Sequence, residues 1–223
     1  MTSGTLRADR QPGLLITFEG PEGSGKTTLV HGLTERLVQC GCEPVVVREP
    51  GGTDAGEAIR QVLLDPGGAE LCAEAELLLM VASRAQLVRE KLKPALAAGM
   101  IVLCDRFADA SVAYQGWGRE LGVDAVHQAN AFALDGLMPD LTFLCLLSPE
   151  EGRARLAGRD RETDRLDRES LAFHRRVYEG YLEMAGSGDP RFHVIDATRP
   201  PAEMLEQALV RLHRLEHGLL KYV

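Results

Sequence analysis

One stretch near the N-terminus of this 223-residue chain decides its fold, Gly20-Pro21-Glu22-Gly23-Ser24-Gly25-Lys26-Thr27-Thr28. It follows an apolar run at 14–18 and precedes a helical pattern whose apolar residues between 29 and 37 share one face. The spacing Gly20-x4-Gly25-Lys26-Thr27 fits the phosphate-cradling P-loop, which joins a strand to a helix in this way.

The residue types in this stretch match the chemistry of phosphate binding. Glycines let the backbone curl so that successive N–H groups point inward at phosphate oxygens, and the N-terminus of the next helix adds its dipole. Lys26 can reach the outer phosphates, and the Thr27 hydroxyl can ligate Mg²⁺. We therefore expect residues 20–28 to bind a nucleoside triphosphate.

Composition and charge narrow the class of protein. The chain is 45% hydrophobic and 26% charged, which suits one globular domain, expected over residues 13–223 after a disordered lead-in of residues 1–12. A formal net charge of −8 argues against bulk nucleic-acid binding, which needs a basic face. Five cysteines without a CxxC pair suggest neither a disulfide framework nor a zinc site. Without a signal peptide or a membrane-spanning run, we expect a cytoplasmic location.

Apolar strand patterns alternate with helical patterns along the chain. Strands are expected at 14–19, 44–47, 100–104, 141–147 and 191–195, with helices at 26–39, 54–64, 71–98, 122–136, 171–184 and 201–217. The polar, small-residue stretch 108–118 is assigned to neither class. This alternation predicts an α/β fold, a doubly wound parallel sheet of five strands with helices on both faces.

Ligands of such sheets bind beyond the carboxyl ends of the strands, where the P-loop, the loop 48–53, Asp105-Arg106 and the Asp196-Ala197 turn should converge on one cleft. Asp105 is placed to reach Mg²⁺, although it could instead cap a helix. Arg106 beside a phosphate cradle indicates a second anion, the alternative being a surface ion pair.

Segment 153–168 is rich in arginine and contains no lysine; its arginines are Arg153, Arg155, Arg159, Arg161, Arg165 and Arg168. The P-loop itself carries no arginine, so further cationic stabilisation of a transferring phosphoryl group must come from elsewhere. We interpret the segment as a mobile lid, because the arginine fork pairs with phosphate bidentately. A solvated helix crossed by ion pairs is the alternative interpretation.

Four further side chains are candidates for an acceptor site. Glu22 would repel phosphates, so it is expected to point toward a hydroxyl of the second substrate unless it faces solvent. Tyr114 could pack on a sugar and Gln115 could contact a base edge, with core packing of Tyr114 as the alternative. Arg84 lies on an apolar helix face and needs a carboxylate or a ligand base as its partner.

Taken together, the motifs resemble those of bacterial thymidylate kinases over residues 14–217. They occur in the same order as in that family, namely Gly20–Thr28, Arg48-Glu49-Pro50-Gly51-Gly52-Thr53, Ser83-Arg84-Ala85-Gln86, Asp105-Arg106-Phe107, Ala113-Tyr114-Gln115-Gly116 and Asp164-Arg165. The resemblance implies transfer of the γ-phosphoryl group of ATP to dTMP, giving dTDP and ADP for dTTP synthesis. It also implies Mg²⁺, a homodimer, a nucleoside monophosphate kinase-like sheet of five strands, and a flexible lid.

The resemblance also implies roles for individual residues. Lys26 and Thr27 hold ATP phosphates and Mg²⁺, with Asp105 as the acid on the metal side. Arg106 grips the phosphate of dTMP, and either Arg159 or Arg161 of the lid completes the catalytic set. The residues expected to contact dTMP are Glu22 near the 3′-hydroxyl, Arg84 at thymine, Tyr114 under the deoxyribose, and Arg48, Pro50, Met80, Arg106, Ser111 and Gln115 around them.

Met80 departs from the family, which usually carries a phenylalanine there that stacks on thymine. Methionine keeps apolar contact but loses the stack, which weakens the expectation of a strict thymine preference. Two rival functions stay open at this point: another P-loop kinase acting on a nucleoside or a different monophosphate, and a nucleotide-dependent switch. The second lacks support, because no Asn-Lys-x-Asp segment follows a strand.

Overall fold

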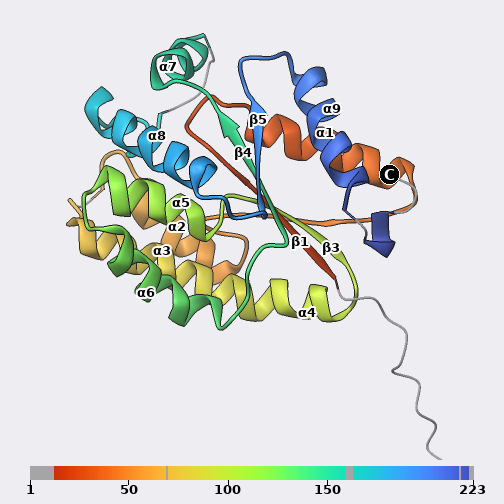
Figure 1. The fold of residues 1–223 in the computed structure, drawn as a ribbon. Helices are drawn as coiled ribbons and strands as arrows, with labels where there is room; N and C mark the ends of the chain where they lie inside the picture. The colour runs from red at the N-terminus through yellow and green to blue at the C-terminus, as the bar shows by residue number, and fades with distance from the viewer. Residues whose placement is uncertain (1–12, 69, 159–162, 216, 221–223) are drawn as a thin grey trace, which may run out of the picture.

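The computed structural model describes residues 13–68, 70–158, 163–215 and 217–220. The predicted lead-in at 1–12 lies outside the described residues. A five-stranded sheet in the order β2-β3-β1-β4-β5, parallel at every pairing, forms the centre of the molecule and confirms the predicted α/β architecture (Figure 1). Its strands are β1 (Leu14–Glu19), β2 (Val45–Arg48), β3 (Ile101–Asp105), β4 (Leu141–Leu146) and β5 (Phe192–Asp196).

Strand β1 is the central strand, between β3 and β4, and all six of its residues are therefore buried. Ile16 pairs with Leu103 of β3 on one side and with Leu141 of β4 on the other. After β1 the chain runs to β2 and back to β3 on one side, and then crosses to β4 on the other side. The carboxyl end of β1 is therefore a topological switch point, which is where sheets of this kind bind ligands.

Helices cover both faces of the sheet, as predicted. They are α1 (Lys26–Gln39), α2 (Asp54–Leu64), α3 (Ala73–Leu87), α4 (Lys93–Ala97), α5 (Ala108–Ser111), α6 (Val123–Leu134), α7 (Pro149–Ala157), α8 (Leu171–Gly186) and α9 (Pro201–His213), followed by the 3₁₀ turn Gly218–Leu220. None of the described helices is long and apolar enough to cross a membrane.

The two faces of β1 contribute to different hydrophobic clusters because successive strand residues point to opposite sides. Ile16 and Phe18 pack with α1 and α9, whereas Leu15 packs in a cluster that includes Leu87, the last residue of α3. Figure 1 shows α1 and α9 together on one side of the sheet and α2, α3, α4 and α6 on the other. This layering leaves the carboxyl ends of the strands open for the loops that form the site.

The helix predicted at 71–98 is continuous from residue 73 to residue 97, but it is not α-helical throughout. Between α3 and α4, the π-helical turn Val88–Leu92 interrupts the α-helical hydrogen-bond pattern, and Pro94 lies in the first turn of α4. Proline is tolerated there because it follows directly on this interruption, where the regular α-helical hydrogen-bond pattern is already broken.

The stretch 108–118, assigned to neither class from the sequence, is helical. It comprises α5 and the π-helical segment Val112–Gly118, which packs closely against α8. Two glycines allow this approach, since a Cβ added to Gly118 would lie 2.7 Å from Phe173 and one added to Gly180 would lie 2.8 Å from Trp117. Gly118, whose residue type disfavours a helix, is therefore one of the two positions that let this segment pack on α8.

Candidate active site

The P-loop curls around the amino group of Lys26. Gly20, Gly23 and Gly25 all have positive φ angles, of 140°, 74° and 85°, which favour glycine. Lys26 Nζ donates to the carbonyl oxygens of Gly20 and Pro21 over 2.9 and 2.8 Å. Burial, reinforced by the nearby charge of Arg106, lowers the pKa of Lys26 to about 8. An anion in the cradle would compensate this buried cation and use the free N–H groups at the start of α1.

Thr27 and Asp105 meet beside the P-loop. Thr27 Oγ1 donates to Asp105 Oδ2 over 2.7 Å, which joins the first turn of α1 to the end of β3. A hydroxyl and a carboxylate supply the hard oxygen ligands that Mg²⁺ prefers. The part of the chain that the structure describes contains no group of three or more His, Cys, Asp or Glu side chains able to hold a metal. The pair therefore fits a Mg²⁺ ion that takes its remaining ligands from water and substrate phosphates, rather than an ion in a protein cage.

Arg106 adopts a left-handed backbone conformation, with φ of 68°, at the turn after β3. Three contacts hold this uncommon conformation in place. Arg106 N donates to Phe18 O over 3.0 Å, Phe107 N donates to Glu19 Oε1 over 2.7 Å, and Cys104 Sγ donates to Arg106 O over 2.9 Å. Such a conformation costs about 1–3 kcal/mol and persists only where its surroundings enforce it. The turn thus aims one guanidinium group at a fixed place.

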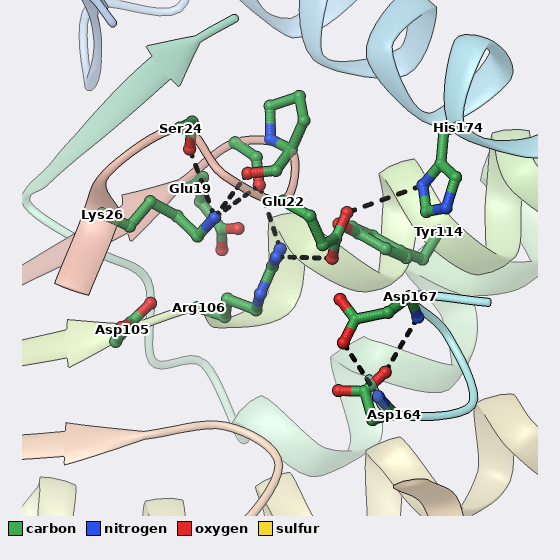
Figure 2. Close-up of polar contacts among 12 residues, drawn as sticks. Glu19, Glu22, Ser24, Lys26, Asp105, Arg106, Tyr114, Asp164, Asp167 and His174 are labelled. Carbon is green, nitrogen blue, oxygen red and sulfur yellow. Dashed lines mark hydrogen bonds and ion pairs between the residues drawn. The ribbon is translucent and has the colours of Figure 1, made fainter. Parts of the chain in front are cut away.

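The Arg106 guanidinium contacts two residues of the P-loop, Gly20 and the half-buried Glu22 (Figure 2). It donates to Gly20 O over 3.1 Å and to Glu22 Oε1 over 2.9 Å, and it stacks over the Tyr114 ring at 4.9 Å. Figure 2 shows Lys26 and Arg106 side by side, with Glu22 beyond them. Two cations that both contact the carbonyl oxygen of Gly20 form an anion site at the mouth of the P-loop.

Glu22 turns away from the phosphate cradle, as the sequence predicts for a carboxylate in this loop. Its Oε1 accepts hydrogen bonds from Arg106 and from the Tyr114 hydroxyl. Burial favours a raised pKa for Glu22, but the charges of Arg106 and Lys26 together outweigh it, so the pKa is lowered and the group is ionised. Its Oε2 is buried and has no hydrogen-bond partner among the described residues, although His174 Nδ1 lies 3.6 Å away. Glu22 therefore keeps one acceptor oxygen that lacks a donor among the described residues and is enclosed by protein.

Arg84 is 1% exposed and forms the base of the site. Its guanidinium donates twice to Glu49 Oε2, at 2.9 and 2.6 Å, and the remaining bonds go to Ser111 Oγ, Asn130 Oδ1 and Phe107 O. The sequence analysis predicted a carboxylate or a ligand base as the partner of Arg84, and in the structure this partner is the carboxylate of Glu49. All five N–H groups of Arg84 are used within the protein, so a ligand would have to share one of them.

A cavity of about 330 Å³, here named the Arg106 cavity, unites these groups. This volume falls in the range of small-molecule sites. All nine residues predicted to contact dTMP line it, and these are Glu22, Arg48, Pro50, Met80, Arg84, Arg106, Ser111, Tyr114 and Gln115. Lys26, Thr27 and Asp105 line the same cavity, which places the predicted phosphate and metal groups at its edge.

A second cavity of about 350 Å³ lies along the P-loop and is named the Thr198 cavity. Its walls include Arg155 of α7 and the loop after β5, with Thr198 and Arg199. Gly23, Gly25 and Thr28 line both cavities, so the P-loop forms a wall that the two share. The single cleft expected from the sequence is in fact two cavities, because the P-loop stands between the loop after β2 and the loop after β5.

Comparison with known proteins agrees with this geometry. The family model described as Thymidylate kinase matches residues 18–208. The chain belongs to the thymidylate kinase family. Among its relatives, a thymidylate kinase of Bacillus pumilus (strain SAFR-032) is 46% identical over 198 residues, which cover 88% of this chain and 93% of the relative. A thymidylate kinase of Bacillus velezensis (strain DSM 23117 / BGSC 10A6 / LMG 26770 / FZB42) is 47% identical over the same shares of both chains.

The predicted lid of this family member is described only in part. Residues 153–157 belong to α7, which lies so close to the P-loop that a Cβ on Gly152 would be 2.4 Å from Glu22 O. Arg165 lies in the turn at 163–168, at the C-terminal end of the predicted lid. It donates to Leu63 O over 2.8 Å and to the carboxylate of Glu76. Arg159 and Arg161, the predicted catalytic arginines, lie outside the described residues.

Sequence reasoning missed several residues of the two cavities. In the Thr198 cavity these are Thr198 and Arg199, although the turn at the carboxyl end of β5 was a signal for them. Arg155 was expected only as one of the lid arginines and not as part of this wall. Arg60 also lines the Arg106 cavity, but it belongs to no motif that could have indicated this from the sequence. Glu76 was also missed; it is a fully buried carboxylate one turn before Met80 on α3, and a charge on an apolar helix face was the available signal.

Proposed function

We propose that this protein transfers the γ-phosphoryl group of ATP to dTMP, giving dTDP and ADP for dTTP synthesis. One observation carries the proposal: two nucleotide-sized cavities share the wall formed by Gly23, Gly25 and Thr28 of the P-loop. A single-nucleotide switch needs only one such cavity, whereas a phosphoryl transfer between two nucleotides needs both. Membership of the thymidylate kinase family supports dTMP over another acceptor.

On the acceptor side, the Arg106 cavity would hold dTMP. Its phosphate would lie at the half-buried Arg106 and the buried Lys26, the two cations at the mouth of the P-loop. Its sugar would pack near Tyr114, with its 3′-hydroxyl at the Glu22 carboxylate. Glu22 Oε2 has no donor among the described residues but is enclosed by protein, so the carboxylate would have to turn toward the cavity to accept this hydroxyl. A hydroxyl donor there would satisfy a buried carboxylate oxygen that is otherwise costly to leave unpaired.

On the donor side, the P-loop would bind the ATP phosphates and the Thr198 cavity would receive the nucleoside. Thr27 and Asp105 would hold Mg²⁺, which neutralises charge on the phosphate oxygens when it is bound. Lys26 would exchange its bonds to loop carbonyls for bonds to phosphate. The reaction needs positioning and charge stabilisation rather than a strong base.

We also propose that a lid arginine completes the charge stabilisation, with Arg159 and Arg161 as the candidates. Their place in the sequence, between α7 and the turn at 163–168, supports this role. Arg155, which donates weakly to Gly23 O over 3.4 Å, already lies beside the P-loop and would contact the donor nucleotide.

A homodimer is the third part of the proposal. Helices α2, α3 and α6 pack side by side, and each exposes a large apolar side chain. Val62 is 52% exposed, Leu78 is 62% exposed and Phe132 is 82% exposed. Covering these side chains with a second copy would remove apolar surface from water.

We further propose that the protein works in the cytoplasm, where its nucleotides are found, and that it binds no nucleic acid. All five cysteines are free, which suits a reducing compartment. The net charge of −8 disfavours binding to a polyanion.

A substrate panel tests the function. With MgATP, the purified protein should phosphorylate dTMP far faster than dCMP, dGMP or AMP, and absence of dTDP would refute the proposal. Lys26→Ala should abolish transfer with the fold intact by circular dichroism. Lys93→Ala is the matched control, because Lys93 pairs with Asp135 outside both cavities and its loss should leave the rate unchanged.

A further inference from the structure

Glu76 is a fully buried carboxylate that none of the groups above requires for phosphoryl transfer. It lies on α3 and does not line the Arg106 cavity. Gln115 Nε2 donates to its Oε1 over 2.8 Å, and Arg119 Nη2 and Arg165 Nη2 donate to its Oε2 over 2.9 and 2.7 Å. Burial favours a raised pKa for Glu76, but the hydrogen bonds from Arg119, Gln115 and Arg165 outweigh it and the pKa is lowered. The group is therefore an ionised, immobile acceptor.

An ionised carboxylate fixes the orientation of the amide that contacts it. It can only accept hydrogen bonds, so the Gln115 side chain must turn its NH₂ group toward Glu76 and its carbonyl oxygen the other way. With either arginine alone Glu76 could still pivot, but two arginines from different segments hold it. The usual freedom of a glutamine to exchange its two ends is thus removed.

The carbonyl end of Gln115 is left for a ligand. Gln115 lines the Arg106 cavity, and among the described residues none donates a hydrogen bond to its Oε1. That oxygen is not one of the two described side-chain atoms that are fully buried without a partner, Glu22 Oε2 and Glu49 Oε1, so it keeps access to the cavity. Arg84 has no free N–H with which to occupy it.

We propose that Glu76 is a positioning residue that sets the base preference of the Arg106 cavity, by locking Gln115 with its carbonyl oxygen toward the acceptor nucleotide. This inference rests on the proposed function. A fixed acceptor selects a base whose edge carries a ring N–H, as thymine does at N3. A cytosine base presents a lone pair at N3, which would face the Gln115 oxygen and leave both unpaired.

The test compares two nucleotides that differ in this edge but share the methyl group, dTMP and 5-methyl-dCMP. Calorimetric titration of the wild-type protein should give a clear preference for dTMP. In Glu76→Gln the new amide can face Gln115 with either end, so the Gln115 amide can rotate. We expect the preference to fall about tenfold or more, as for one base-edge hydrogen bond, with KM for ATP unchanged.

A second variant keeps the test decisive if Glu76→Gln folds poorly. Gln115→Leu removes the amide but leaves Glu76 with Arg119 and Arg165, and it should lose the same preference. Combining both substitutions should cause no further loss. Glu169→Gln is the matched control: it removes the other carboxylate on Arg119 and should keep the wild-type preference.

The outcomes separate the inference from the function. If the wild-type protein does not phosphorylate dTMP, the proposed function fails. If it does, and Glu76→Gln or Gln115→Leu keeps the full preference for dTMP over 5-methyl-dCMP, the positioning role of Glu76 is wrong. If Glu76 had only a structural role, its substitution would weaken the binding of dTMP and of 5-methyl-dCMP equally. The ratio of the two affinities would then be unchanged, which would likewise overturn the inference.

Discussion

Thr27 Oγ1 and Asp105 Oδ2 lie 2.7 Å apart, joined by a hydrogen bond between the first turn of α1 and the last residue of β3. The two residues are 78 positions apart in the sequence. Their meeting follows from the parallel pairing of β1 with β3, since Phe18 pairs with Asp105 and the P-loop follows directly after β1. A hydroxyl and a carboxylate are thereby held at the edge of the phosphate cradle, where a phosphate-bound Mg²⁺ would need oxygen ligands.

Replacing Asp105 should weaken the binding of Mg²⁺ at the active site. Asp105→Asn keeps the size of the side chain but removes its charge, and we expect about a 10–100-fold loss of activity at limiting Mg²⁺, as is typical of groups that orient a metal through its ligands. The measurement is the rate of dTDP formation as a function of Mg²⁺ concentration, and saturating Mg²⁺ should restore part of the loss.

The matched control for this prediction is Asp65→Asn, at an exposed turn where an amide oxygen can still accept from Gly67 N. It should show the wild-type dependence on Mg²⁺. An Asp105→Asn protein with that same dependence would remove Asp105 from the metal site.

The pair of Arg84 and Glu49 should matter more for stability than any exposed ion pair. Their side chains are 2% and 3% exposed. Arg84→Met would leave the Glu49 carboxyl buried without its partner, and we expect the free energy of unfolding to fall by about 3–5 kcal/mol. Urea denaturation followed by circular dichroism measures this change.

A second arginine offers the comparison. Arg48 pairs with Glu57 at 58% and 42% exposure, so Arg48→Met should change the free energy of unfolding by less than about 1 kcal/mol. Equal effects of the two substitutions would show that burial of the Arg84 pair does not determine its contribution.

Glu19 should make stability depend on pH. Burial, together with the charge of Asp109, raises its pKa from 4.5 to about 8. Between these values the folded protein keeps a proton that the unfolded chain has lost. Its contribution to stability is therefore fully present below pH 4.5 and is lost as the pH rises to about 8, with a slope of up to about 1.4 kcal/mol per pH unit. Glu19→Gln has no such proton, so its free energy of unfolding should fall less steeply between pH 5 and pH 8.

Lys26 affects this measurement only at the upper end of the pH range. Its pKa is lowered from 10.5 to about 8, so its effect falls between those values, above the window of Glu19, and has the opposite sign. Urea titrations of both proteins at pH 5, 6, 7 and 8 provide the comparison. Parallel curves for wild type and Glu19→Gln would mean that Glu19 is ionised in the folded protein throughout.

The parts of the site that were predictable from sequence are contiguous or lie at strand ends. The P-loop is one unbroken motif, and Asp105 follows an apolar strand whose carboxyl end must face the same edge of a parallel sheet as the P-loop. Once the sheet is parallel, no further information is needed to bring Lys26, Thr27 and Asp105 together.

Contacts that depend on the third dimension were not predictable. The sequence indicates that Arg84 needs a partner, but only folding brings Glu49 to it from 35 residues away. The stretch 108–118 contains Gly116 and Gly118, which disfavour a helix locally; its helical form depends on packing against α8, where Gly118 admits the Phe173 ring. In this segment the packing against α8 outweighs the low helix propensity of the two glycines.

The exposed phenylalanine on α6 provides the last prediction. Phe132 is 82% exposed, and Leu78 on the neighbouring helix α3 is 62% exposed. If a second copy covers this face, Phe132→Glu would bury a charge against apolar surface, which is costly without a partner. We expect the variant to be monomeric by sedimentation equilibrium at concentrations where the wild-type protein is a dimer. Val210→Glu is the control, since Val210 is also exposed but lies on α9; it should keep the wild-type mass. A wild-type protein that sediments as a monomer, or a Phe132→Glu dimer, would exclude this face as the interface.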